Sequence, residues 1–171
     1  MSKPLITLVL GGARSGKSRF AESLALDSGL SLLYLATAEA FDTEMEQRIS
    51  RHRQDRGPAW TTVEEPIDLT KTLEAHATEE TLILVDCLTL WLSNLMGREA
   101  EIDAAFDEFM DAVGGLKGPV IFVSNEVGQG IVPDNEMARQ FRDHAGRLHQ
   151  RLAETADRVY LVTAGLPQKL K

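Results

Sequence analysis

Short apolar segments alternate with longer amphipathic segments along the chain. Apolar, partly β-branched runs are typical of buried parallel strands. They occupy residues 5–10, 31–37, 81–86, 119–124 and 158–162, and residues 60–66 alternate like a short edge strand. Because strands and helices are expected to alternate, the pattern predicts an α/β fold with a mostly parallel sheet and helices on both faces.

Apolar residues at intervals of three and four predict the helices between these strands. We expect them at residues 18–26, 43–56, 69–76, 88–96, 102–113 and 134–157. Thr43 and Asp134 are the expected N-caps of two of them, and a short Lys-rich tail follows the last strand. The expected inner face of the last helix carries Met137, Phe141, His144, Leu148 and Leu152. On that face we interpret His144 as a hydrogen-bonded core residue.

Composition and charge restrict the class of protein. The 171 residues are 43% hydrophobic and 26% charged, which is ordinary for one globular domain over residues 1–171. A net charge of −8 without a long basic block gives no general attraction to nucleic acid or anionic lipid. No apolar run is long enough to span a bilayer, and no signal-peptide pattern is present. With Cys87 as the only cysteine, we expect a cytoplasmic protein with no nucleic-acid partner and no stable membrane anchor.

The first expected strand leads into the pattern G-x-x-x-x-G-K-[ST], which residues 11–18 match as GGARSGKS. We call these residues the phosphate loop, because such a loop turns its backbone N–H groups inward at the start of a helix. Lys17 would reach the outer phosphates of a nucleotide, and the Ser18 hydroxyl would bind Mg²⁺. An ordinary glycine turn would not need Lys17 and Ser18 at these positions.

Two further strands end in residues that suit a nucleotide site. Asp86 ends an apolar run, as acids do in many sheet proteins, but beside a phosphate loop it predicts a carboxylate that holds the Mg²⁺ shell through Ser18 and water. The small residues at 36–38 would let a ligand approach the backbone, although tight packing explains them nearly as well.

The helix at residues 43–56 carries a histidine with possible chemistry. One stripe of that helix holds Met45, Ile49, His52 and Arg56. If its apolar end packs on the protein body, His52 and Arg56 face inward; a solvated basic helix is the alternative. A neutral imidazole can attack the α-phosphate of a nucleoside triphosphate and expel pyrophosphate.

Residues 125–133 follow a strand and contain two glycines and a carboxylate, which predicts a loop rather than a helix. At the carboxyl edge of a sheet such a loop suits a substrate, with a purely structural loop as the alternative. The general base for a substrate hydroxyl stays open among Glu64, Asp86 and Glu126.

Together these segments resemble the bifunctional adenosylcobinamide kinase / adenosylcobinamide-phosphate guanylyltransferase family. The resemblance rests on residues 11–19, 36–38, the block Arg48-Ile49-x-x-His52-Arg53-x-x-Arg56, residues 125–133 and residues 138–147. Many unrelated enzymes share the phosphate loop, whereas the His52 block and residues 125–133 are far more specific. The similarity extends from the first expected strand to the last.

The resemblance implies two reactions in one RecA-like P-loop domain. ATP or GTP phosphorylates adenosylcobinamide, and GTP then supplies GMP through a covalent guanylyl-histidine, which by position is His52. Lys17 is the second catalytic residue, and Mg²⁺ would be bound by Ser18 and Asp86. The implied nucleotide contacts are Gly11, Gly12, Ala13, Arg14, Ser15, Gly16, Lys17, Ser18, Ala36, Thr37, Ala38, Arg53, Gln54, Asp55, Arg56, Glu64 and Asp86. The resemblance also implies a homotrimer with the active site near a subunit boundary.

One departure and two alternatives accompany this interpretation. His149 stands where we expect an asparagine in the family, and Glu65 beside Glu64 leaves the nucleotide-contacting acid uncertain by one residue. The first alternative is a kinase in which His52 merely binds phosphate. The second is a RecA-like motor or nucleotide-gated interaction module, against which the acidic balance and small size argue.

Overall fold

The computed structural model describes residues 3–41 and 43–171, except for the side chains of Arg48, His52, Arg53 and Asp55. Its strands are β1 (Ile6–Gly11), β2 (Ser31–Ala36), β3 (Trp60–Glu64), β4 (Thr81–Asp86), β5 (Val120–Asn125), β6 (Arg158–Thr163) and β7 (Leu166–Lys169). They form one sheet in the order β3-β2-β4-β5-β1-β6-β7. Neighbouring strands are parallel except for β7, which is antiparallel to β6. The predicted mostly parallel sheet, with β3 at its edge, is confirmed.

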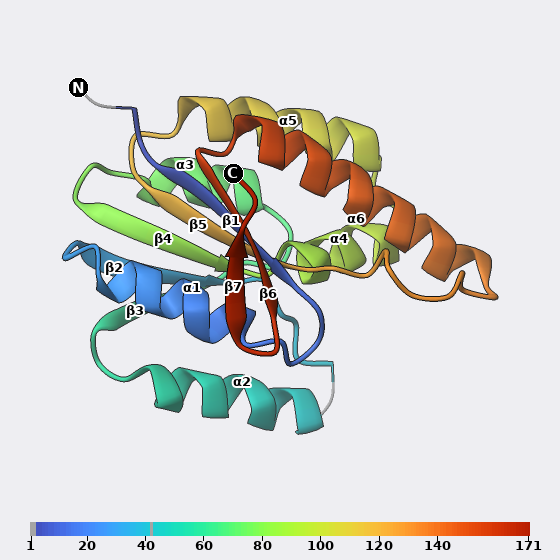
Figure 1. The fold of residues 1–171 in the computed structure, drawn as a ribbon, viewed down its shortest axis with the longest axis horizontal. Coiled ribbons are helices and arrows are strands. Elements are labelled where there is room, and N and C mark those ends of the chain that lie inside the picture. Colours follow the sequence, from blue (N-terminus) through green and yellow to red (C-terminus); the bar gives the residue numbers. More distant parts are fainter. Residues whose placement is uncertain (1–2, 42) are drawn as a thin grey trace.

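Helices cover both faces of this sheet (Figure 1). They are α1 (Lys17–Leu26), α2 (Thr43–Arg56), α3 (Leu69–His76), α4 (Leu88–Gly97), α5 (Ile102–Gly115) and α6 (Glu136–Thr155). In Figure 1, α1 and α2 lie on one side of the strands and α3 to α6 on the other. None of these helices has the length and apolar character needed to cross a bilayer.

The sheet buries apolar side chains on both faces, which explains its continuous apolar runs. Leu8 and Phe122 pack with Trp91 and other residues of α3 to α6 in the larger core cluster. Val9, from the same strand as Leu8, belongs instead to the smaller cluster beneath α1. Successive residues of β1 therefore anchor opposite helix layers, and this fixes the end of β1 from which the phosphate loop starts.

Two expected N-caps are wrong. Asn135, not Asp134, caps α6, since its Oδ1 accepts the Ala138 N–H at 2.8 Å. Thr43 is the first helical residue of α2 rather than its N-cap; residue 42, which precedes it, lies outside the described residues.

The buried face of α6 is rotated from the expected one. It carries Ala145, Leu148, His149 and Leu152. Met137 is 72% exposed, because the amino-terminal part of α6 extends beyond the strands (Figure 1). His144 is only half-buried and lies 2.8 Å from a guanidinium nitrogen of Arg147. The buried, hydrogen-bonded histidine is therefore His149, and the interpretation of His144 as a core residue is wrong.

The Lys-rich tail forms β7, which we had not predicted. Ala164 and Gly165 both have positive φ, 52° and 77°, and make the tight turn that returns the chain along β6. The Gly165 N–H donates to the Ser15 carbonyl at 2.7 Å. The turn between β6 and β7 thus supports one side of the phosphate loop.

Candidate active site

The phosphate loop, Asp86 and Asn125 meet at the carboxyl edge of the sheet. Strand β5 lies between β1 and β4. Gly11 pairs with Asn125 across β1 and β5, and Asp86 pairs with Val123 across β4 and β5. Because these parallel strands end at nearly the same level, side chains distant in the sequence reach one site.

Two glycines of the phosphate loop have a steric or conformational reason to be glycine. A Cβ atom on Gly11 would lie 2.3 Å from Ser15 Oγ and 2.9 Å from the Val162 carbonyl oxygen. Gly16 has a φ of 91° immediately before α1, a conformation that other residues rarely adopt. The backbone can therefore curl tightly enough to turn its N–H groups toward a phosphate.

Lys17 and Ser15 give this loop the polar groups that an anion needs. Lys17 is only 9% exposed, and its Nζ donates to the Gly12 carbonyl at 3.2 Å, so the ammonium lies across the loop. Ser15 Oγ is buried and has no hydrogen-bond partner among the described residues. Buried polar atoms normally have partners, and a phosphate oxygen would supply one.

Asp86 receives two hydroxyl donors on one oxygen. Ser18 Oγ donates to Asp86 Oδ2 at 3.2 Å, and the Tyr34 hydroxyl donates to the same atom at 2.7 Å. Burial, and then the Asp86 charge, raise the pKa of Tyr34 above its ordinary value, so its hydroxyl remains a donor. Oxygen ligands from one hydroxyl and one carboxylate, completed by phosphates and water, are the set that Mg²⁺ prefers. The residues present therefore fit the expected metal.

Helix α2 reaches this site through its last residue. The Arg56 guanidinium carbon lies 3.4 Å from the centre of the Tyr34 ring, and Arg56 Nε is buried without a hydrogen-bond partner among the described residues. Met45 and Ile49 are half-buried, as the predicted inward stripe requires. Gln54 is exposed. The side chains of His52, Arg53 and Asp55 lie outside the described residues, so their predicted roles stay predictions.

The segment after β2 is packed more tightly than a simple ligand contact requires. Thr37 is completely buried; its Oγ1 donates to the Cys87 carbonyl at 2.7 Å and accepts the Cys87 N–H at 2.9 Å. Its carbonyl accepts from Asn94 Nδ2 at 2.8 Å. Thr37 therefore ties this segment to the start of α4, while Ala36 and Ala38 are half-buried at the sheet edge. Burial, and next Asp86, also raise the pKa of the Cys87 thiol, which keeps it protonated.

The two neighbouring glutamates have different surroundings. Glu65 Oε1 accepts the N–H groups of Ile67 and Asp68, each at 2.9 Å, so this carboxylate stabilises the turn before α3. Glu64 is exposed and ends β3 in register with Ala36. Both glutamates stand at the carboxyl end of β3, since the Glu65 N–H also donates to the Ala36 carbonyl at 2.9 Å, but the Glu65 carboxylate is engaged in the turn.

The segment after β5 is a loop, as predicted. Glu126 Oε1 accepts the Gly128 N–H at 2.6 Å, and Ile131 is 98% exposed. Behind this loop His149 Nε2 lies 2.7 Å from Ser124 Oγ, and burial lowers the pKa of His149. At the position where we expected an asparagine, the chain therefore places a neutral histidine in contact with the strand that carries Asn125.

Sequence reasoning missed Tyr34 and Gly165. Tyr34 lies within an apolar run, where its polar hydroxyl was the only available signal. Gly165 lies in the segment after the last expected strand, for which the sequence indicates only a short Lys-rich tail.

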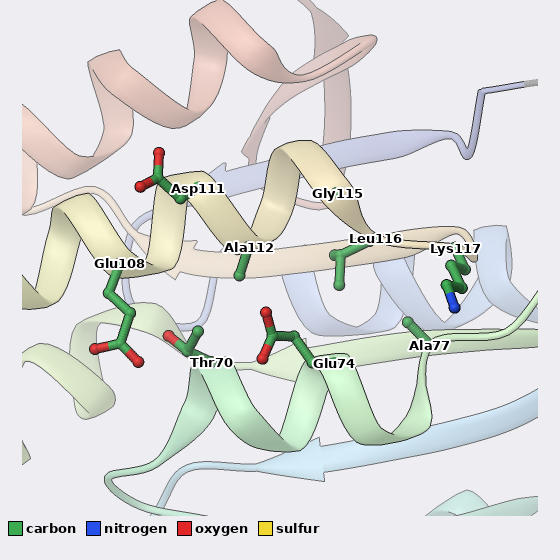
Figure 2. Close-up of a pocket in the computed structure, with 9 residues that line it drawn as sticks. All are labelled: Thr70, Glu74, Ala77, Glu108, Asp111, Ala112, Gly115, Leu116 and Lys117. Atoms are coloured by element: carbon green, nitrogen blue, oxygen red, sulfur yellow. The ribbon is translucent and has the colours of Figure 1, made fainter.

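A cleft of about 490 Å³, apart from the candidate active site, lies between α3 and α5 (Figure 2). Its polar lining includes Glu74, Glu108, Asp111 and Lys117. Figure 2 shows Glu74 on α3, Glu108 and Asp111 on α5, and Lys117 in the loop that follows α5. None of the predicted site residues lines this cleft.

Comparisons with known proteins agree with the geometry. The family model for cobinamide kinase / cobinamide phosphate guanyltransferase matches residues 7–170. The bifunctional adenosylcobalamin biosynthesis protein CobP of Pseudomonas aeruginosa is 49% identical over 166 residues, covering 96% of each chain. The protein CobU of Escherichia coli, with the same description, is 40% identical over 182 residues and covers 98% of this chain and 100% of its own.

Solved structures with low sequence identity share the fold. The flagellar accessory protein FlaH of Methanocaldococcus jannaschii has a TM-score of 0.54 at 16% identity, over 98% of this chain and 78% of its own. The RadB recombinase has a TM-score of 0.51 at 14% identity, over 92% of this chain and 73% of its own. These likenesses confirm the predicted RecA-like P-loop fold. The family match and the near full-length relatives show that this chain belongs to the cobinamide kinase / cobinamide phosphate guanyltransferase family.

Proposed function

We propose that this chain phosphorylates adenosylcobinamide with ATP or GTP and then transfers GMP from GTP to the new phosphate. The products of the second step are adenosylcobinamide-GDP and pyrophosphate. The observation that carries the proposal is the hydrogen bond of 3.2 Å from Ser18 to Asp86 beside the buried Lys17. Membership of the family supplies the substrate class.

In the first step the aminopropanol hydroxyl of adenosylcobinamide attacks the γ-phosphorus, and the bond from the γ-phosphorus to the bridging oxygen breaks. The hydroxyl proton leaves to a base, and a nucleoside diphosphate is released. Lys17 stabilises the negative charge on the transferring phosphoryl group. Ser18 and Asp86 would hold Mg²⁺, which supplies further charge neutralisation when bound.

In the second step a ring nitrogen of His52 attacks the α-phosphorus of GTP, and pyrophosphate leaves. An oxygen of adenosylcobinamide phosphate then attacks the same phosphorus, the P–N bond breaks, and His52 is regenerated. The support for His52 is its position one turn before Arg56 on α2, since Arg56 packs against Tyr34, which itself contacts Asp86. That chain of contacts would bring α2 to the nucleotide.

The remaining nucleotide contacts would come from the ends of β1, β2 and β3 and from helix α2. We assign residues 11–18 to the phosphates, Ala36, Ala38 and Glu64 to the exposed sheet edge, and the arginines at 53 and 56 to the phosphates from α2. The Thr37 side chain is fully buried, so it would stabilise this edge through its bonds to Cys87 rather than contact the nucleotide itself.

We also propose that the chain assembles as a homotrimer. Its support is a set of exposed apolar side chains close together in the sequence, before and at the start of α6: Ile131 is 98% exposed, Val132 63% and Met137 72%. Contiguous exposed apolar surface marks interaction sites, and these residues would contribute to one. The cytoplasmic location stays a prediction.

Product analysis tests the proposal. Purified protein is incubated with adenosylcobinamide, GTP and Mg²⁺, and the corrinoid products are separated and identified by mass spectrometry. We expect adenosylcobinamide phosphate followed by adenosylcobinamide-GDP; His52→Ala should stop at the phosphate, and Lys17→Ala should form neither product. His76→Ala, at the exposed end of α3, is the matched control and should form both. Accumulation of the phosphate alone by the unmodified protein would instead identify a kinase without nucleotidyl transfer.

A further inference from the structure

Tyr34 contacts two parts of the candidate site that are far apart in the sequence. Its hydroxyl bonds to Asp86 at the end of β4, and its ring packs under Arg56 at the end of α2. We infer that Tyr34 is a positioning residue that holds the Mg²⁺-side carboxylate and helix α2 in one fixed arrangement. The inference rests on the proposed function, because it assigns separate consequences to the two steps.

The first half of this role, which we call the hydroxyl half, is the bond from the Tyr34 hydroxyl to Asp86, and the register of the strands makes it possible. Tyr34 pairs with Leu84, two residues before Asp86 on the neighbouring strand β4. The hydroxyl can therefore reach the carboxylate along the edge, and at 2.7 Å its bond to Oδ2 is shorter than the 3.2 Å bond from Ser18. A hydrogen bond to a charged acceptor is strong and directional. It restricts rotation of the Asp86 carboxylate relative to the Ser18 hydroxyl, the other expected Mg²⁺ ligand.

The second half of the role, which we call the ring half, is the contact of the Tyr34 ring with the end of α2 and the start of β3. The Arg56 guanidinium lies over one face of the Tyr34 ring, 3.4 Å from the ring centre to its carbon. Trp60, the first residue of β3, meets the same ring edge-on at 5.9 Å between centroids. The end of α2 and the start of β3 are thus both anchored on Tyr34. An arginine within this distance of an aromatic face is attracted to it.

Stacking also presents Arg56 to an anion. A guanidinium held by its face keeps its N–H groups at the edge, where they can reach acceptors in its plane. Arg56 Nε is buried and has no partner among the described residues. A phosphate oxygen of the nucleotide would satisfy this donor. The ring of Tyr34 therefore matters most for the step that uses α2, whereas its hydroxyl matters wherever Mg²⁺ is used.

The two halves are separated by three variants. Tyr34→Phe removes the hydroxyl and keeps the ring, whereas Tyr34→Leu removes both. Arg56→Lys keeps the charge and the Tyr34 hydroxyl but loses the planar face. Tyr160→Phe is the matched control, since Tyr160 is a half-buried tyrosine on β6 whose ring packs edge-on against Phe20 of α1.

The first measurement is the Mg²⁺ dependence of binding of a fluorescent GTP analogue, which needs no turnover. We expect Tyr34→Phe to raise the Mg²⁺ concentration for half-maximal binding roughly tenfold, and Tyr160→Phe to leave it at the wild-type value. An unchanged Mg²⁺ requirement in Tyr34→Phe would overturn the hydroxyl half, whatever reaction the protein catalyses.

The second measurement is the ratio of guanylyl transfer to kinase rate at saturating Mg²⁺. Tyr34→Leu and Arg56→Lys should lower this ratio roughly tenfold, while Tyr34→Phe should keep it. If both rates fell equally, in proportion to the folded fraction measured by urea unfolding, Tyr34 would be merely structural. Failure of the unmodified protein to transfer GMP would contradict the proposed function and the ring half, and the Mg²⁺ titration would still decide the hydroxyl half.

Discussion

Ser18 and Asp86 are 68 positions apart in the chain, and the Ser18 hydroxyl donates to Asp86 Oδ2 at 3.2 Å. Ser18 lies in the first turn of α1, whereas Asp86 ends β4, and β5 separates β4 from β1 in the sheet. Only the completed sheet edge brings the two oxygens together. Their contact therefore joins the phosphate loop to the strand that carries the expected Mg²⁺-binding acid.

Removing the Asp86 charge should weaken Mg²⁺-dependent binding and both reactions. Asp86→Asn keeps the size of the side chain but presents a weaker ligand, so we expect both rates to fall about 10²–10³-fold. Isothermal titration with GTP at several Mg²⁺ concentrations checks the binding effect. Asp111→Asn, on the exposed side of α5, is the control; equal behaviour of the two variants would remove Asp86 from the metal site.

Adding a methyl group to Gly11 should distort the phosphate loop. Its Cβ would lie 2.3 Å from Ser15 Oγ and 2.9 Å from a backbone oxygen of Val162, so the free energy of unfolding should fall by about 1–3 kcal/mol for Gly11→Ala. GTP binding should weaken as well. At Gly146 an added Cβ meets no atom within 4 Å, and Gly146→Ala should unfold in urea no more easily than wild type. Comparable losses in both variants would contradict the steric explanation.

Thr37 should contribute to stability through its hydroxyl. Thr37→Val has nearly the same shape but leaves the N–H and carbonyl of Cys87 without their side-chain partner, at a cost of about 1–3 kcal/mol in the free energy of unfolding. Thr37→Ser keeps the hydroxyl and should lose less. Urea unfolding of the two variants decides the matter, and an equally stable Thr37→Val would show that the bonds to Cys87 are dispensable.

The buried His149 should make stability depend on pH. Burial holds its pKa below the ordinary value, so in the window below about pH 6.5 the unfolded chain binds a proton that the folded chain does not. The free energy of unfolding should therefore fall as the pH decreases through that window. Urea unfolding at about pH 7.5 and about pH 5.5 should show a smaller decrease for His149→Asn than for wild type. His76→Asn, at an exposed position, is the control and should retain the wild-type decrease. A decrease of wild-type size in His149→Asn would show that other groups cause the pH dependence of stability.

Local patterns were enough to predict strands β1 to β6, the helices and the phosphate loop, because residues close in sequence produce them. Predicting Asp86 as a metal-binding acid required one more step, because an acid at the end of a strand is informative only when a phosphate loop occurs in the same chain. Strand β7 was not predicted because all four of its residues are exposed. Backbone pairing with β6 holds it in the sheet, so its sequence needs no alternation of apolar and polar residues.

Helix α6 illustrates a different limit. Helical spacing identified an apolar stripe, but the angle at which α6 crosses the sheet decides which residues meet the core. The crossing buries Ala145 and His149 and leaves Met137 beyond the strands. The position of Tyr34 between Asp86 and Arg56 could not be predicted either, because three separate segments create it.

The central claim is that His52 carries GMP between GTP and the corrinoid phosphate. Its most direct test is incubation with GTP labelled in the α-phosphate and Mg²⁺, followed by denaturation and counting of label on the protein. We predict acid-labile label on wild type and on His76→Ala, and none on His52→Ala, which should still phosphorylate adenosylcobinamide from GTP labelled in the γ-phosphate. Absence of retained label on wild type, or equal label on His52→Ala, would contradict the account.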